Sequence, residues 1–213
     1  MIKVKICGLS SPESVAAAVD AGADYVGFVF YARSPRHVTA VQASLLARGV
    51  PQGVTKVGLF VDAGDAAIAG VLAQVNLDYL QLHGAETPER AGQIRARFGL
   101  PVLKAIAISS HEDILRAETY ADVTDIFLFD ASPPLTADAL PGGNGLVFDW
   151  TLIAGHEWPR PWMLSGGLNA GNLAGAVRIS GAKMIDVSSG VETAPGIKDS
   201  AKIRAFVETA KNL

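Results

Sequence analysis

The sequence contains a single cysteine, Cys7, which ends a short apolar run and is followed directly by Gly8. Most free cysteines are small buried hydrophobes, but a thiolate can act as a base when nearby positive charge lowers its pKa. Lys5 precedes Cys7 by two residues and therefore shares its face of an extended strand. We expect Lys5 to pair with Asp186, across adjoining first and last strands, and to favour the thiolate form of Cys7.

A carboxylate, Asp130, ends a second apolar run that begins at Ile126. Such a position is costly for a charge unless it is paired or lies at an exposed mouth. One interpretation is a turn or helix-capping residue. In the other interpretation, the apolar neighbours raise the pKa of Asp130, which then acts as a general acid.

Two glycine-rich turns could bind a phosphate through their backbone N–H groups, although Gly-Gly pairs are also common in ordinary turns. Their candidate binding residues are Ser165, Gly166 and Gly167 in the first turn, and Ser188, Ser189 and Gly190 in the second. A third run, residues 142–145, could close over the same ligand. Arg36 is either a solvated surface residue or a clamp for a substrate carboxylate.

The four histidines do not form a metal-binding pattern. His83 follows a short apolar run, but His37, His111 and His156 are scattered, and no carboxylate stands beside them at ligand spacing. We therefore predict no metal site. Asp62 and Asp149 have the surroundings of turn or cap residues.

These residues must be positioned by short apolar segments that alternate with alanine-rich ones. The apolar segments are bounded by Gly, Pro, Asp or Ser and are typical of buried parallel strands. The strands are predicted at Lys3–Cys7, Tyr25–Phe30, Thr55–Asp62, Tyr79–His83, Val102–Ile106, Ile126–Asp130, Trp162–Ser165 and Met184–Ser188. Helices are predicted at Pro12–Ala21, Val41–Arg48, Gly64–Val75, Thr87–Phe98, His111–Thr119, Phe148–Ile153, Asn169–Ile179 and Ser200–Lys211.

This alternation predicts an α/β fold with a parallel sheet covered by helices. Eight units in 213 residues leave about 27 residues for each, which suits a single-domain (β/α)8 TIM barrel over residues 1–213. A doubly wound open sheet is the competing architecture. In a barrel, the reactive groups gather where the strands end. The long connection over residues 131–145 is typical of a functional lid or a disordered loop.

Composition excludes several classes of protein. Hydrophobic residues make up 49% and charged residues 18%, so the chain can bury a core and is not of the disordered type. A formal net charge of −3 argues against a nucleic-acid partner, and no apolar stretch reaches the length of about 18 residues that a membrane helix needs. With one cysteine and no secretory pattern at Met1–Lys5, we expect a cytoplasmic protein. Exposed apolar patches, which distinguish monomers from dimers, depend on the tertiary structure.

Several segments together resemble the phosphoribosylanthranilate isomerase family of tryptophan biosynthesis, whose members are (β/α)8 barrels. They occur in the family's order over nearly the whole chain. The matching segments are Lys5–Leu9, Gly27–Phe30, Ser34–Arg36, Val57–Val61, Leu80–Gly84, Phe129–Asp130, Gly142–Gly145, Phe148–Trp150, Leu164–Leu168, Asp186–Glu192 and Pro195–Asp199. Asn144 and Ser10 stand where the family often has threonine.

The resemblance implies an aldose–ketose isomerisation, the Amadori rearrangement of phosphoribosylanthranilate, with Cys7 as general base and Asp130 as general acid. It places Arg36 at the substrate carboxylate, the two glycine-rich turns at the phosphate, and His83 and Asp186 among the substrate-binding residues. No cofactor is implied, because the reaction needs no external oxidant and no electron sink.

Two other functions remain open at this point. One is a different phosphosugar isomerase or epimerase, which would use paired aspartates or metal-binding His and Asp rather than a cysteine. The other is a barrel that binds a phosphate ligand without catalysis, which would need neither Cys7 nor Asp130.

Overall fold

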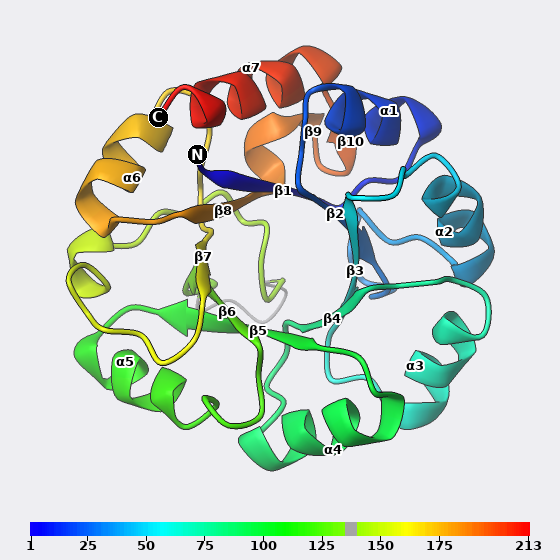
Figure 1. Cartoon of the computed structure of the whole chain (residues 1–213), viewed down its shortest axis with the longest axis horizontal. Helices are drawn as coiled ribbons and strands as arrows, with labels where there is room; N and C mark the ends of the chain where they lie inside the picture. The colour runs from blue at the N-terminus through cyan, green and yellow to red at the C-terminus, as the bar shows by residue number, and fades with distance from the viewer. Residues whose placement is uncertain (135–139) are drawn as a thin grey trace.

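A closed ring of parallel strands with helices on its outside forms the computed structural model, which describes residues 1–134 and 140–213 (Figure 1). The last strand pairs with the first, with Lys5 opposite Asp186, so the open sheet is excluded and the predicted barrel is confirmed. The strands are β1 (Lys3–Cys7), β2 (Tyr25–Val29), β3 (Thr55–Phe60), β4 (Tyr79–Leu82), β5 (Val102–Ile108), β6 (Ile126–Ala131), β7 (Trp162–Leu164) and β8 (Met184–Val187).

The helices cover the outer face of this ring. They are α1 (Pro12–Asp20), α2 (Ala40–Ala47), α3 (Asp65–Leu72), α4 (Pro88–Phe98), α5 (His111–Glu118), α6 (Leu173–Ser180) and α7 (Ser200–Lys211). The start of α1 follows from its sequence, because the Ser11 hydroxyl accepts from the Ser14 N–H while the Ser14 hydroxyl accepts from the Ser11 N–H. None of the described helices is both long and apolar enough to cross a membrane.

The connection from β6 to β7 differs from the prediction. The expected helix over Phe148–Ile153 is only a three-residue 3₁₀ turn, η1 (Trp150–Leu152), capped by the carboxylate of Asp149. Short apolar segments commonly form such single turns, and Gly155 lies close behind this one. Residues 135–139 of the predicted long connection lie outside the described residues.

A small unit after β8 was not predicted from the sequence. A 3₁₀ turn, η2 (Ser189–Val191), leads into the antiparallel pair β9 (Glu192–Ala194) and β10 (Ile197–Lys198). The two strands are too short to give a periodic pattern. This unit brings Glu192 and Lys198 to the end of the barrel at which β8 ends.

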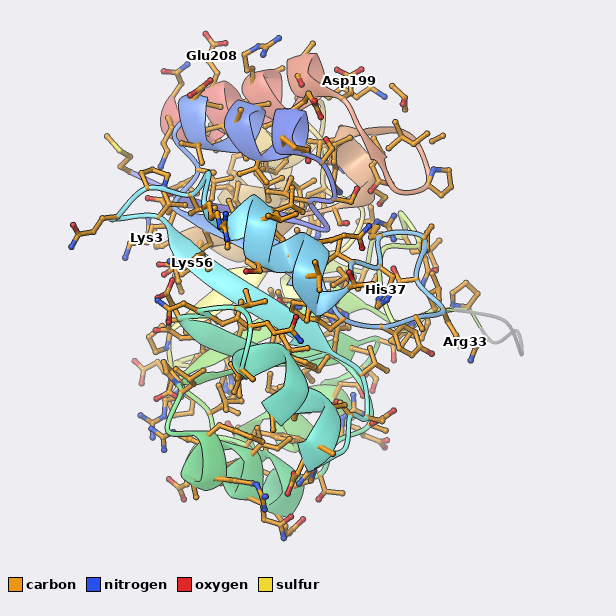
Figure 2. The ribbon with its side chains drawn as sticks, turned by 90° about the vertical axis from the view of Figure 1, so that its right-hand side faces the viewer. Lys3, Arg33, His37, Lys56, Asp199 and Glu208 are labelled. Atoms are coloured by element: carbon orange, nitrogen blue, oxygen red, sulfur yellow. The ribbon has the colours of Figure 1, made fainter. Side chains whose placement is uncertain are left out.

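Side-chain alternation divides the core into two layers. Val4 and Ile6 of β1 join the cluster between barrel and helices, whereas Val57, Leu128 and Met163 belong to a separate cluster that fills the barrel interior. Figure 2 shows the molecule from the side, with Lys3 and Lys56 near the amino-terminal ends of their strands and Arg33 and His37 at the opposite end. The polar interior residues lie toward this second end, where they meet a pocket.

Candidate active site

The carboxyl-terminal ends of the strands surround a pocket of about 760 Å³ that is open to solvent. Every residue that the sequence nominated for the site lines it, although these residues come from six different strand ends and loops. They are Cys7, Arg36, His83, Asp130, Ser165, Gly166, Gly167, Asp186, Ser188, Ser189 and Gly190. The barrel brings these residues together because all of its strands point the same way.

The predicted Lys5–Asp186 ion pair is present below Cys7. Lys5 is completely buried and its Nζ lies 2.7 Å from Asp186 Oδ1, while Asp186 Oδ2 accepts a hydrogen bond of 3.2 Å from the Ser165 hydroxyl. Burial by itself would lower the pKa of Lys5, but attraction to Asp186 and Cys7 outweighs it and raises that pKa. Lys5 is therefore a permanent cation inside the barrel.

The expectation that Lys5 makes Cys7 a ready thiolate needs correction. Burial is the largest influence and raises the pKa of the Cys7 thiol, and the carboxylate of Asp186 raises it further. Lys5 and Lys198 lower it, as the expected pairing requires, but the balance leaves the pKa of Cys7 above its ordinary value.

Asp130 lies on the other side of the pocket, next to His83. Its Oδ1 accepts a 2.8 Å hydrogen bond from the Ala131 N–H, and its Oδ2 lies 3.3 Å from His83 Nε2. The side-chain nitrogen of buried Gln81 lies 2.8 Å from His83 Nδ1. Because that nitrogen is a donor, Nδ1 is the acceptor and the ring proton lies on Nε2. The imidazole thus presents an N–H toward Asp130, and sequence reasoning gave Gln81 no part in this.

The glycine-rich turns after β7 and β8 present backbone donors to the pocket. The N–H groups of Gly166 and Gly167 make no hydrogen bond to another described residue, and Ser189 begins η2, where the first N–H groups lack partners within the turn. The Ser188 hydroxyl instead donates 3.1 Å to the backbone oxygen of Cys7, which ties the second turn to the end of β1. This edge of the pocket has the donors that an anion requires.

Arg36 is buried rather than solvated, and most of its guanidinium is engaged. Its Nε and Nη2 donate to the two carboxylate oxygens of Glu192 at 2.8 and 2.9 Å, and Nη2 also lies 3.2 Å from the Gly143 oxygen. The Lys198 ammonium joins the same carboxylate at 2.8 Å. Sequence analysis placed Glu192 and Lys198 in matching segments but gave them no role, since Arg36 lies 156 residues before Glu192.

Within residues 1–134 and 140–213, no three His, Cys, Asp or Glu side chains are grouped so that they could hold a metal ion. His83 is accounted for by Gln81 and Asp130. Asp62 and Asp149, predicted as turn or cap residues, accept hydrogen bonds from the N–H groups of Ala85 and Thr151 respectively.

Comparison with known protein families shows which family this chain matches. Residues 4–209 match the family model described as N-(5'phosphoribosyl)anthranilate (PRA) isomerase. The chain belongs to this family. Among curated PRA isomerases, that of Parvibaculum lavamentivorans is 57% identical over 211 residues, covering 99% of this chain and 98% of the relative. That of Rhodospirillum centenum is 56% identical over 212 residues, covering 100% and 99%.

Solved PRA isomerases share the barrel over its full length. The crystal structure of the Thermotoga maritima enzyme has a TM-score of 0.89 and 37% identity, with 100% of both chains covered. A PRA isomerase in complex with reduced 1-(o-carboxyphenylamino)-1-deoxyribulose 5-phosphate has a TM-score of 0.86 and 36% identity, again with 100% of both chains covered. The fold class and the family expected from the sequence are therefore confirmed.

Proposed function

We propose that this member of the PRA isomerase family converts N-(5′-phosphoribosyl)anthranilate to 1-(2-carboxyphenylamino)-1-deoxyribulose 5-phosphate, with Asp130 as general acid and Cys7 as general base. The observation that carries the assignment is the joint placement of Cys7 and Asp130 on one pocket, together with two donor-rich turns and Arg36. Acyl transfer would need a base beside the thiol, whereas His83 lies beside Asp130.

The first step opens the ribose ring. Protonated Asp130 donates to the ring oxygen as the bond between that oxygen and C1 breaks, and the nitrogen lone pair forms the C1=N bond of a Schiff base. Asp130 becomes a carboxylate at this point, with His83 Nε2 3.3 Å from its Oδ2.

The second step moves a proton from carbon. The thiolate of Cys7 removes the proton from C2, the C–H electrons form the C1=C2 bond, and the former C1=N electrons return to nitrogen. The resulting enolamine tautomerises to the ketone. Substrate and product have the same composition, so the thiol proton and the Asp130 carboxylate are reset by exchange with solvent. Each proton transfer of this kind contributes about 10²–10⁴-fold.

Binding groups surround these two residues. The N–H groups at Gly166 and Gly167, which bond to no other described residue, and the start of η2 at Ser189 supply donors for the phosphate. Arg36 supplies donors for the anthranilate carboxylate. Asp186, held by Lys5, faces the pocket where the ribose hydroxyls would lie.

Loss of anthranilate-type fluorescence on incubation with phosphoribosylanthranilate tests the whole assignment. We expect turnover by the unchanged protein, with Cys7→Ser and Asp130→Asn lowering kcat by at least about 10²-fold. Both variants should still bind the reduced product analogue nearly as tightly as the unchanged protein, because neither substitution removes a binding group.

The same variants separate the alternatives that the sequence left open. Full activity in either one would contradict the acid and base assignment. Absence of turnover in the unchanged protein, with binding retained, would instead indicate a barrel that binds without catalysis.

A further inference from the structure

Glu192 and Lys198 do not line the pocket, and the steps above give Glu192 no role. We propose that Glu192 is a positioning residue for Arg36, which it holds with the Nη1 group of the guanidinium turned to the substrate carboxylate, and that Lys198 keeps this cluster positively charged. This inference rests on the proposed function, because it concerns how the anthranilate carboxylate is recognised.

The geometry leaves the Nη1 group of Arg36 available. Glu192 accepts from Nε and Nη2 and the Gly143 oxygen also accepts from Nη2, so among the described contacts the two N–H groups of Nη1 remain. Nη1 lies beside Gly143, where a Cβ would overlap it, and both residues line the pocket. A carboxylate approaching from the pocket would meet the two donors of Nη1, which carry the charge of the guanidinium.

Four hydrogen bonds hold the Glu192 carboxylate in place. Oε1 accepts from Arg36 Nε at 2.8 Å and from Lys198 Nζ at 2.8 Å, while Oε2 accepts from Arg36 Nη2 at 2.9 Å and from the Gly196 N–H at 3.3 Å. Burial would raise the pKa of Glu192, but its bonds to Arg36 and Lys198 outweigh burial and lower that pKa. The carboxylate therefore remains charged and fixes the plane of the guanidinium before any ligand arrives.

Lys198 decides the net charge of the cluster. Arg36 and Glu192 alone would sum to zero and would offer an anionic ligand donors without net attraction. The side chain of Lys198 is 1% exposed, and its ammonium also donates to the Ser188 backbone oxygen at 2.9 Å. Burial lowers the pKa of Lys198, and its ion pair with Glu192 opposes this. The ammonium form, which Glu192 stabilises, leaves the cluster at +1 beside the pocket, in a buried setting where water screens little.

A fixed, partly neutralised arginine suits a rigid planar ligand. Long side chains lose rotamer entropy when a ligand immobilises them, and Arg36 has already been immobilised on folding. The alternative is that the ion pair between Glu192 and Arg36 only attaches the β9–β10 hairpin to the barrel. The two roles differ in whether Glu192 affects recognition of the carboxylate in particular.

The experiment compares two ligands that differ only in that group. One is the reduced product analogue, and the other is the same compound with an unsubstituted phenyl ring. Calorimetry gives both dissociation constants, and their ratio measures the advantage given by the carboxylate. We expect a ratio of about 10- to 100-fold for the unchanged protein, as for a charge-assisted hydrogen bond.

Glu192→Gln should lower this ratio at least about fivefold while the phenyl compound binds nearly as before, because only the carboxylate uses the fixed Nη1 group of Arg36. Lys198→Met should lower it about threefold or more through the lost charge. The matched control is Glu86→Gln, which also removes a buried carboxylate from an ion pair with a lysine but lies away from Arg36. Its ratio should equal that of the unchanged protein.

An unchanged ratio in Glu192→Gln would overturn the positioning role, and an unchanged ratio in Lys198→Met would overturn the charge role. If the unchanged protein bound neither ligand, the proposed function itself would fail. If a variant does not fold, hydrogen exchange in the unchanged protein still tests the inference. The Nε–H of Arg36 should exchange with solvent at least about tenfold more slowly than that of exposed Arg33, and equal rates would contradict the inference.

Discussion

Lys5 and Asp186 face each other across the strand pair that closes the barrel, with Nζ and Oδ1 2.7 Å apart in the interior. Lys5 also lies on the same face of β1 as Cys7, so this pair places a fixed positive charge below the thiol. The charge offsets part of the cost of ionising a buried sulfur.

Replacing Lys5 with methionine should raise the pKa of Cys7 further, because burial and Asp186 would then act with only Lys198 opposing them. The rate of Cys7 alkylation, measured against pH, should shift to higher pH in this variant. The loss of one member of a buried ion pair should also cost about 3–5 kcal/mol of unfolding free energy. Lys3→Met is the control, since exposed Lys3 lies on the same strand, and an unaltered alkylation profile in Lys5→Met would disprove the coupling.

The raised pKa of Cys7 predicts the pH dependence of catalysis. The base is the thiolate, and an upward shift means that less of it is present at a given pH below that pKa. The value of kcat/KM, which reports the free enzyme, should therefore increase about tenfold per pH unit on the acid side of the thiol pKa. Steady-state fluorescence assays from pH 6 to 9 would check this. A flat profile across that range would mean that Cys7 is already ionised or is not the base.

Gly166 has a left-handed backbone, with φ at 88°, and a Cβ there would come within 3.2 Å of Asp130 Oδ1 and 2.8 Å of the Ala131 nitrogen. Gly166→Ala should thus displace the acid and lower kcat/KM at least about tenfold, in addition to a backbone cost of about 1 kcal/mol. Gly181→Ala provides the matched control, because Gly181 has φ of 75° and no atom within 4 Å of an added Cβ. Equal activity in the two variants would refute the steric contact.

The wall of the barrel that carries His83 depends on a second buried ion pair. Lys104 Nζ lies 2.9 Å from Glu86 Oε2, with both side chains almost fully buried, and it also donates to the Gly84 backbone oxygen at 2.8 Å. Lys104→Met should destabilise the protein by about 3–5 kcal/mol. Arg97→Met, which removes an exposed pair with Asp65, should cost less than about 1 kcal/mol. Denaturant unfolding of both variants measures the difference, and similar losses would contradict the role of burial.

Much of the fold was predictable because its signals are local. The strand at Lys3–Cys7 was predicted with the bounds that the structure has. The segment at Phe148–Ile153 was mispredicted because its apolar spacing fits both an α-helix and a single 3₁₀ turn. The hairpin of β9 and β10 left no periodic pattern at all.

The sequence by itself placed Cys7, Asp130 and the glycine-rich turns at or near the carboxyl ends of strands. Parallel strands necessarily present those ends on one face, so these residues could be assigned to a common site. Only the tertiary structure decided the state of these groups. The pKa of Cys7 depends on how completely the barrel excludes water, and the orientation of Arg36 depends on Glu192, far along the chain. Burial and long-range charge pairing arise only when the barrel closes, and no local pattern encodes their balance.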